Sequence, residues 1–201
     1  MHHSHLYGHL LTVVDVETTG VIPNYHEIIQ IACVPLDENY NPSKRYRHFY
    51  LDGIAPDHPE RMGRDAKLKN HLDPYKLAEE YVSQSRAADL LEEWFLSLAL
   101  PADKRLVPLA HNWPFERSML QAWLGPDSFN TLWDGRARDT QCSVALINDI
   151  HSWQGNEVPF SSISLISCCN RLGIELDNAH NALADCIATA KVYRELIRLF
   201  G

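Results

Sequence analysis

An apolar segment near the start of the chain ends in two acidic residues, and this combination constrains the fold more than any other feature. Leu10–Glu17 reads LLTVVDVE and is apolar on both faces, as in a central strand of a buried sheet. Asp15 and Glu17 are two positions apart, so a strand directs both side chains to one face. Burying an unpaired carboxylate costs several kcal/mol. We therefore expect either a cation beside these acids or a strand end that simply reaches solvent.

The pattern along the rest of the chain predicts an α/β fold. Strands are expected at Glu27–Leu36 and Arg45–Leu51, and residues 53–72 read as a loop or a broken helix. The second half alternates between helices and short strands. The helices are expected at Ala87–Leu98, Pro114–Leu124, Ser162–Leu172 and Ala182–Phe200. The short strands are expected at Arg105–Ala110 and Arg136–Thr140. Three strands followed by this alternation indicate a mixed sheet flanked by helices.

Composition narrows the class of protein. The 201 residues suit one domain, expected at residues 10–201, and residues 1–9, with four histidines, are expected to be a disordered or tag-like end. No apolar run approaches the ~20 residues of a membrane span, and the N-terminus does not resemble a signal peptide. The five cysteines are an odd number and form no C-x-x-C pair, which favours reduced thiols in a cytoplasmic protein.

The net charge of −8 argues against a protein that coats long duplex DNA, because such proteins are usually basic. The charge is compatible with an enzyme that grips one chain end through metal ions. Four cationic residues, Arg61, Arg64, Lys67 and Lys69, form a local basic cluster. This cluster either tracks an incoming nucleic-acid strand or is an ordinary solvated loop.

Two further acids fall on apolar faces of expected helices. With a rotation of ~100° per residue, Glu116 shares a face with Met119 and Leu120. By the same rotation, Asp185 shares a face with Val192. A carboxylate on an apolar face needs a partner, although a snorkelling or locally paired glutamate is an alternative explanation for Glu116.

A histidine precedes the last of these acids. His180 lies five residues before Asp185, about 140° around an ideal helix, so the two share a site only if His180 is on the turn before the helix. A structural or capping histidine is the alternative. Four carboxylates directed inward from three segments would repel one another unless cations lay between them. Hard oxygen ligands without sulfur suit Mg²⁺ or Mn²⁺, so the pattern predicts a divalent-metal site.

Three short motifs carry these acids and the histidine. They are D-x-E-T-x-G at Asp15–Gly20, H-N-x-x-F-[acid]-x-x-x-L at His111–Leu120 and H-x-A-x-x-D at His180–Asp185. In order and spacing they resemble the exonuclease motifs of the DEDDh 3′→5′ exonucleases, the DnaQ-like and ribonuclease T-like enzymes. EIIQIA at Glu27–Ala32 resembles the second strand of that family, and RDT at Arg138–Thr140 resembles the short strand before a later helix. The resemblance implies a ribonuclease H-like mixed five-stranded sheet whose first three strands are antiparallel.

The resemblance also implies an activity. The expected reaction is hydrolysis of the terminal phosphodiester bond at a single-stranded DNA or RNA 3′ end, with release of nucleoside 5′-monophosphates. Two ions, Mg²⁺ or Mn²⁺, would activate the attacking water and stabilise the developing charge. The resemblance implies that Asp15 bridges the two ions and that Glu17 and Asp185 complete the site of the first ion. It places Glu116 near the second ion and makes His180 the general base.

Four further residues are assigned to the substrate by the same resemblance. Backbone or hydroxyl groups of Thr18 and Thr19 would contact the terminal nucleotide. Asn112 and Phe115 would shape the pocket, although Phe115 could equally belong to the core. The family also makes a polymerase or a second copy of the chain an expected partner, whereas a membrane is not expected.

One position departs from the family pattern, because Glu116 stands where the family has aspartate. The extra methylene moves the carboxylate by ~1.5 Å, so Glu116 either reaches the second ion directly or displaces it. Besides the stand-alone exonuclease, two alternatives follow. One is a non-catalytic domain of the same fold that binds nucleic-acid ends, and the other is a proofreading subunit that docks on a polymerase.

Overall fold

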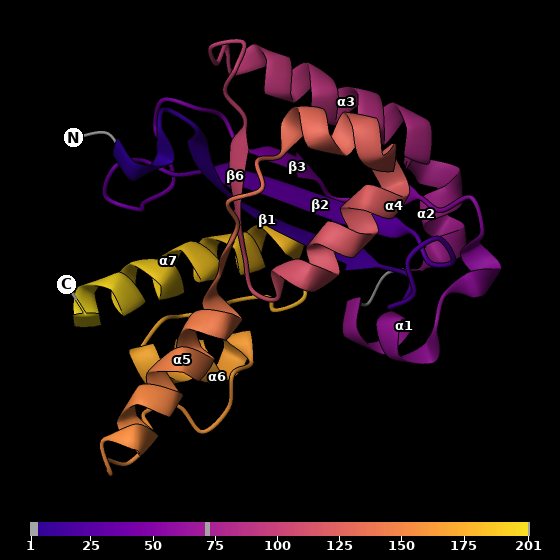
Figure 1. The fold of residues 1–201 in the computed structure, drawn as a ribbon. Helices are drawn as coiled ribbons and strands as arrows, with labels where there is room; N and C mark the ends of the chain where they lie inside the picture. Colours follow the sequence, from indigo (N-terminus) through magenta and orange to yellow (C-terminus); the bar gives the residue numbers. More distant parts are fainter. Residues whose placement is uncertain (1–3, 71–72, 201) are drawn as a thin grey trace.

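The computed structural model describes residues 4–70 and 73–200, which fold around a five-stranded mixed sheet (Figure 1). In spatial order the strands are β3 (Phe49–Leu51), β2 (Ile28–Pro35), β1 (Leu10–Thr18), β6 (Leu106–Ala110) and β7 (Arg138–Asp139). The pairs β1–β2 and β2–β3 are antiparallel, and the pairs β1–β6 and β6–β7 are parallel. The predicted fold class, a ribonuclease H-like mixed sheet whose first three strands are antiparallel, is confirmed.

Helices cover both faces of this sheet. They are α1 (Arg64–Asn70), α2 (Pro74–Glu80), α3 (Gln84–Ser97), α4 (Trp113–Leu132), α5 (Thr140–Trp153), α6 (Leu165–Leu172) and α7 (Ala182–Phe200). A small parallel pair, β4 (Ile54–Ala55) and β5 (Val82–Ser83), precedes α3. Helices α3 and α4 pack on one face and α7 packs on the other (Figure 1). In the described part of the chain, no helix combines the length and the hydropathy that a membrane crossing demands.

The alternation of side chains along β1 decides which way its acids point. Val14 and Val16 are buried in the cluster that contains residues of α3 and α4. Leu11 and Val13 are buried in the cluster that contains the first turns of α7. Asp15 has the parity of Leu11 and Val13, so its side chain faces α7. The register of the β1–β2 pair shifts just after Glu17, and such bulges are common beside active sites.

Besides shifts of one to three residues at the starts or ends of other elements, the structure differs from the expected element boundaries in four places. The edge strand begins at Phe49 rather than Arg45, and the segment expected as a loop or broken helix contains β4, a 3₁₀ turn at Pro59–Arg61 and α1. Helix α4 continues to Leu132 across a kink at Gly125, whose φ of 75° interrupts two helical segments. The fourth difference is α5, a helix of 14 residues that the sequence pattern did not reveal.

The N-terminal segment also differs from its expectation. Residues 1–3 of the expected disordered or tag-like end lie outside the described residues. Ser4–Leu6, however, forms a 3₁₀ turn, and the side chain of Leu6 is fully buried with Leu11 and Leu36. The backbone N–H of Arg105 donates to Nδ1 of His9 over 3.1 Å. Residues 4–9 therefore pack on the sheet, because Leu6 contributes an apolar side chain to the core.

A buried glutamine ties the first turn of α7 to the sheet. The side chain of Gln30 on β2 accepts a hydrogen bond from the backbone N–H of Ala182 at 2.6 Å. Its amide nitrogen donates to the carbonyl oxygen of Asp52 at 3.0 Å and to the Asp52 carboxylate at 3.1 Å. Gln30 lies opposite Glu17 in the β1–β2 register. The same amide therefore sets where α7 begins relative to the acids of β1.

Replacing this glutamine by an apolar residue of similar length tests the tie. Gln30→Met leaves the buried N–H of Ala182 without its acceptor, so the free energy of unfolding should fall by about 1–3 kcal/mol. Gln154→Met, at an exposed position after α5, is the matched control and should stay within about 0.5 kcal/mol of the wild type. Urea unfolding followed by circular dichroism gives both values. Equal losses in the two variants would show that Gln30 does not hold α7.

Candidate active site

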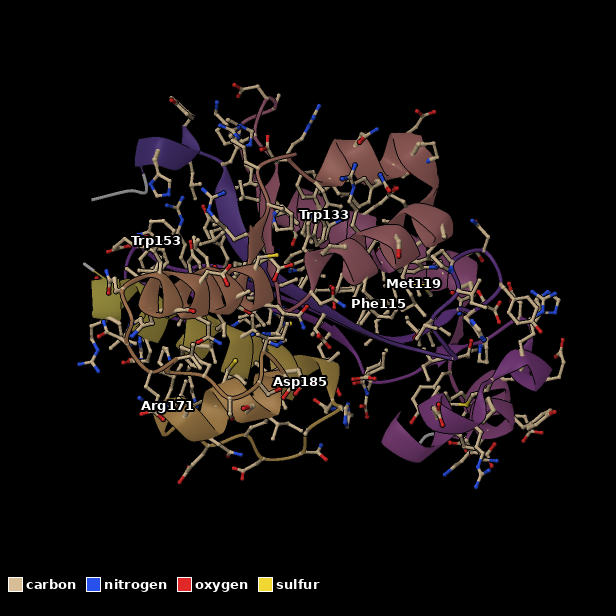
Figure 2. All side chains as sticks on the ribbon, turned by 60° about the horizontal axis from the view of Figure 1, so that its bottom comes forward. Phe115, Met119, Trp133, Trp153, Arg171 and Asp185 are labelled. Carbon is tan, nitrogen blue, oxygen red and sulfur yellow. The ribbon has the colours of Figure 1, made fainter. Side chains whose placement is uncertain are left out.

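A pocket of about 610 Å³ lies at the edge of the sheet where β1 and β6 end. These strands are parallel, so their carboxyl ends meet at one edge, and α4 follows β6 there. Eight of the nine residues that the sequence predicts for the site line this pocket: Asp15, Glu17, Thr18, Asn112, Phe115, Glu116, His180 and Asp185. Figure 2 shows Asp185 on α7 and Phe115 on α4, two helices that both reach the pocket. The fold thus brings together side chains from β1, α4 and α7.

The acids of the pocket repel one another. Burial raises the pKa of Asp15 well above its ordinary value, and the negative charges of Glu116, Glu17 and Asp185 raise it further. All four acids line this one pocket, and the other three act on the charge of Asp15.

Glu116 enters the pocket from the first turn of α4. The residue before this helix, Asn112, has a φ of 99°, and this left-handed conformation turns the chain from β6 into the helix. The Glu116 side chain is buried, and its Oε2 atom has no hydrogen-bond partner among the described residues. Burial raises the pKa of Glu116 well above its ordinary value. A hydrogen bond from its own backbone N–H opposes this rise, and the charges of Asp139 and Glu17 add to it.

Asp185 and His180 reach the pocket from the start of α7. His180 lies on the turn before the helix with a φ of 68°, the placement that the sequence spacing required. Its backbone N–H donates to Oδ2 of Asp185 over 3.2 Å, whereas Oδ1 of Asp185 has no partner among the described residues. Burial raises the pKa of Asp185, and the hydrogen bond and charge of His180 oppose that rise. The imidazole of His180 is exposed at the pocket, and Asp185 is buried.

The donor set of this pocket fits divalent cations. One ligand atom from each of Glu17, His180 and Asp185 lies within 4.8 Å of the other two. Buried carboxylate oxygens without hydrogen-bond donors, one on Glu116 and one on Asp185, are costly unless a cation satisfies them. Carboxylate oxygens are the ligands that Mg²⁺ and Mn²⁺ prefer. The residues present therefore suit the expected ions.

The two threonines after the acids have different surroundings. Thr18 lines the pocket, and its hydroxyl donates to the carbonyl oxygen of Gly20 at 2.7 Å. Thr19 is fully buried and does not line the pocket. Its hydroxyl accepts from the backbone N–H of Glu27, and its own N–H donates to the carbonyl oxygen of Glu27, both over 2.9 Å. The Thr19 side chain therefore links the ends of β1 and β2 rather than facing the pocket.

His111 lines the pocket although the sequence pattern assigned it no role. Its Nε2–H donates to the carbonyl oxygen of Ile163 at 2.9 Å, and its Nδ1 lies 2.7 Å from the hydroxyl of Thr140. Burial lowers the pKa of His111, and the Ile163 carbonyl and the Asp139 charge oppose this shift. Its position directly after β6, before Asn112, was the available signal.

Asp139 is the second residue that the sequence pattern left without a role. One of its carboxylate oxygens accepts from the backbone N–H of Trp113 at 2.8 Å, at the start of α4. The other accepts from the backbone N–H groups of Gln141 at 2.8 Å and Cys142 at 3.1 Å, at the start of α5. A single carboxylate thus caps two helices and fixes the turn that carries Glu116. An aspartate just before a helix is the capping signal that could have identified it.

Solved structures of exonuclease I have the same fold as this chain. The complex of the Escherichia coli enzyme with a dT13 oligonucleotide has a TM-score of 0.75 and 18% identity, over 96% of this chain and 42% of that chain. A moderately thermophilic exonuclease I from Methylocaldum szegediense has a TM-score of 0.72 and 22% identity, over 95% of this chain and 40% of that chain. No protein-family profile and no curated protein matches the sequence.

These comparisons establish the fold at low sequence identity. The predicted resemblance is therefore confirmed for the fold, which this chain shares with exonuclease I structures. The chain spans only 42% and 40% of the two neighbours described above. The activity of this chain is thus argued from its own pocket.

The double cap of Asp139 predicts a measurable contribution to stability. Asp139→Ala removes acceptors from two helix starts, so the free energy of unfolding should fall by about 1–4 kcal/mol, twice the effect of a single cap. Asp139→Asn keeps one carbonyl oxygen and should lose less. Asp149→Ala, at an exposed position of α5, is the control. Urea unfolding measures all three, and an Asp139→Ala value equal to the control would exclude the double cap.

The raised pKa values predict how the metal-free protein responds to pH. Because the folded pKa of Glu116 lies above the unfolded value of about 4, the folded state binds more protons, and stability falls as pH rises from that value. In EDTA, the wild type should therefore melt at a lower temperature at pH 8 than at pH 5.5. Glu116→Gln should melt higher than the wild type at pH 8, since a neutral amide is less costly to bury.

The control for this measurement is Glu79→Gln, at an exposed position of α2, which should melt like the wild type at both pH values. Differential scanning calorimetry gives the melting temperatures. A Glu116→Gln variant that melts below the wild type at pH 8 in EDTA would contradict the proposed repulsion.

Proposed function

We propose that this chain is a metal-dependent 3′→5′ exonuclease that hydrolyses terminal phosphodiester bonds of single-stranded nucleic acid and releases nucleoside 5′-monophosphates. The carrying observation is the meeting of four acids in one pocket, two of them with buried oxygens that lack a donor. The fold likeness to exonuclease I supports the proposal, because one of those structures holds a dT13 oligonucleotide.

The acids would hold two divalent cations, Mg²⁺ or Mn²⁺. Asp15 lies among the other three acids and suits a bridging ligand, Glu17 and Asp185 would complete one site, and Glu116 would serve the other. The bound ions would supply Lewis acidity and neutralise the charge that develops on the phosphate. In this chain the acid of α4 is a glutamate, so its carboxylate extends one methylene further into the pocket than an aspartate would.

His180 is the proposed general base. It stands on the turn before α7 with its ring exposed at the pocket and its backbone N–H fixed to Asp185. Imidazole accepts protons near neutral pH and so suits removal of a proton from the attacking water. Thr18, Asn112 and Phe115 line the same pocket and would surround the terminal nucleotide. The Thr19 hydroxyl lies outside this pocket and accepts from the backbone N–H of Glu27.

The decisive experiment is digestion of matched deoxy- and ribo-oligonucleotides labelled at the 3′ or the 5′ end, with Mg²⁺, Mn²⁺ or EDTA. A 3′ label should be released first as a mononucleotide, and EDTA should abolish the release. Asp185→Asn should slow cleavage strongly, and His180→Ala should slow it by ~10²-fold or more. Asp149→Asn, on the exposed face of α5, is the matched control and should cleave at the wild-type rate.

Two outcomes would contradict the proposal. Release of the 5′ label first would reverse the polarity. Tight binding of the 3′ end without cleavage under any magnesium or manganese supply would instead favour the non-catalytic end-binding domain. Comparing the cleavage of the deoxy and ribo substrates measures the sugar preference in the same experiment.

A further inference from the structure

A second pocket, of about 360 Å³, adjoins the catalytic pocket. His26, in the turn between β1 and β2, lines both pockets. Helix α4 also lines both, with Phe115 in the first and Met119 and Trp123 in the second. Figure 2 shows Phe115 and Met119 together on α4. The two pockets therefore form one track along the first turns of this helix.

Three side chains form a ladder of one cation–ring contact and one edge-to-face ring contact at this junction. The guanidinium of Arg61 lies 5.1 Å from the ring centroid of Tyr25. The Tyr25 ring lies 4.9 Å from the ring of His26, edge to face at 88°. Tyr25 is 49% exposed, so part of this residue is open to a ligand. Aromatic rings next to a cation are the combination that single-stranded nucleic acid uses for stacking and charge pairing.

The backbone holds this ladder in place. Nδ1 of His26 accepts from the N–H of Ile22 over 2.9 Å, so the neutral ring carries its proton on Nε2. The backbone N–H groups of Tyr25 and His26 both donate to the carbonyl oxygen of Ile22. The His26 ring lies against Gly20, where an added Cβ would come within 2.4 Å of Nε2. Only glycine fits beside the ring as it is placed.

The charges around the second pocket favour phosphates on the side of Arg61. Both carboxylate oxygens of Glu27 accept backbone N–H groups, from Asp57 at 3.1 Å and His58 at 2.9 Å. Asp57 adds an acid at the rim and repels phosphates from its own side. The counter-ion of Arg61 is Glu60, 3.9 Å away and 61% exposed. An exposed pair at that distance is weak, so a phosphate can replace Glu60.

Arg64 extends this cationic edge into the first pocket. It lines the catalytic pocket, three residues after Arg61, which lines the second. The segment from the 3₁₀ turn to α1 thus presents one guanidinium to each pocket. These two residues belong to the basic cluster seen in the sequence, of which the Lys69 side chain lies outside the described residues.

We propose that the second pocket binds the nucleotides of a single strand that lie 5′ to the end held in the catalytic pocket. A base stacks on the open part of the Tyr25 ring, a phosphate pairs with Arg61, and the Nε2–H of His26 donates to the strand at the junction. The inference rests on the proposed nuclease function and adds a second binding site to it. Base stacking makes this site tolerant of sequence.

The test compares two substrates that differ in length. A dT10 oligonucleotide spans both pockets, whereas the p-nitrophenyl ester of thymidine 5′-monophosphate occupies only the catalytic one. Tyr25→Ala and Arg61→Ala should raise KM for dT10 by ~5-fold or more, the effect of losing one stacking or phosphate contact. The loss in kcat/KM on dT10 should exceed the loss on the ester by at least that factor. Tyr25→Phe keeps the ring and should restore binding.

Matched controls exist elsewhere on the surface. Arg45 lies 5.0 Å from the Tyr46 ring centroid, as Arg61 does from Tyr25, and lines neither pocket. Tyr75 on α2 is 58% exposed and also lines neither. Arg45→Ala and Tyr75→Ala should behave as the wild type on both substrates. Equal losses on both substrates in Tyr25→Ala and Arg61→Ala, or no loss on dT10, would overturn the subsite.

A binding measurement separates failure of this inference from failure of the proposed function. Fluorescence anisotropy of 5′-labelled dT10 in EDTA reports binding without hydrolysis. If the wild type cleaves neither substrate but Tyr25→Ala still weakens dT10 binding ~5-fold, the nuclease function fails and the subsite stands. If the wild type cleaves dT10 and Tyr25→Ala binds it as tightly, the subsite fails and the nuclease function stands.

Discussion

Repulsion among buried carboxylates is the constraint on which this structure depends. Burial raises the pKa of Asp15, Glu116 and Asp185, so each resists ionisation where the fold has placed it. The polypeptide supplies little charge of its own to offset them. Among the described residues that line the pocket, Arg64 is the single lysine or arginine. The ionised acids are therefore stable in this arrangement only with cations from solution. The folding of this edge of the sheet is thus linked to the chemistry proposed for the pocket.

The scaffold holds the acids mainly through backbone hydrogen bonds. Gln30 fixes the first N–H of α7, Asp139 fixes the starts of α4 and α5, and Glu27 fixes the loop beside the second pocket. The oxygen atoms of each of these side chains accept hydrogen bonds from backbone N–H groups rather than from other side chains. Helix starts leave such groups without intrahelical partners, so they are available for this purpose. The site is consequently built where three elements begin or end.

Sequence periodicity predicted the directions of the acidic side chains well, because covalent geometry fixes the periods of strands and helices. Strand alternation placed Asp15 and Glu17 on one face, and helical rotation placed Glu116 and Asp185 on buried faces, as the structure shows. The placement of His180 on a turn also followed from rotation. The side chain of Thr19, by contrast, is buried against Glu27 and does not line the pocket. The β1–β2 register shifts after Glu17, and this shift determines which of the two adjacent threonines faces the pocket. Such a local irregularity has no sequence period from which it could be predicted.

Helix α5 was missed for a related reason. Val144 and Ile147 are buried, but Ile150 is 40% exposed and Trp153 is 91% exposed, so apolar residues lie on both faces and the amphipathic pattern is blurred. The strand expected at Arg136–Thr140 includes the first residue of α5, and this hid the capping role of Asp139. The buried Leu6 stands alone among polar neighbours, and a single apolar residue carries no pattern. These features depend on tertiary contacts that local sequence does not contain.

The shared carboxylate of Asp139 has a mechanical consequence. Because one side chain is bound to the first residues of both α4 and α5, neither helix can pivot at its start without pulling on the other. Two sides of the pocket are therefore coupled as a single stiff frame. The opposite side of the pocket is held separately, because the backbone N–H of Gly63, before α1, donates to the carbonyl oxygen of Thr19 over 2.8 Å.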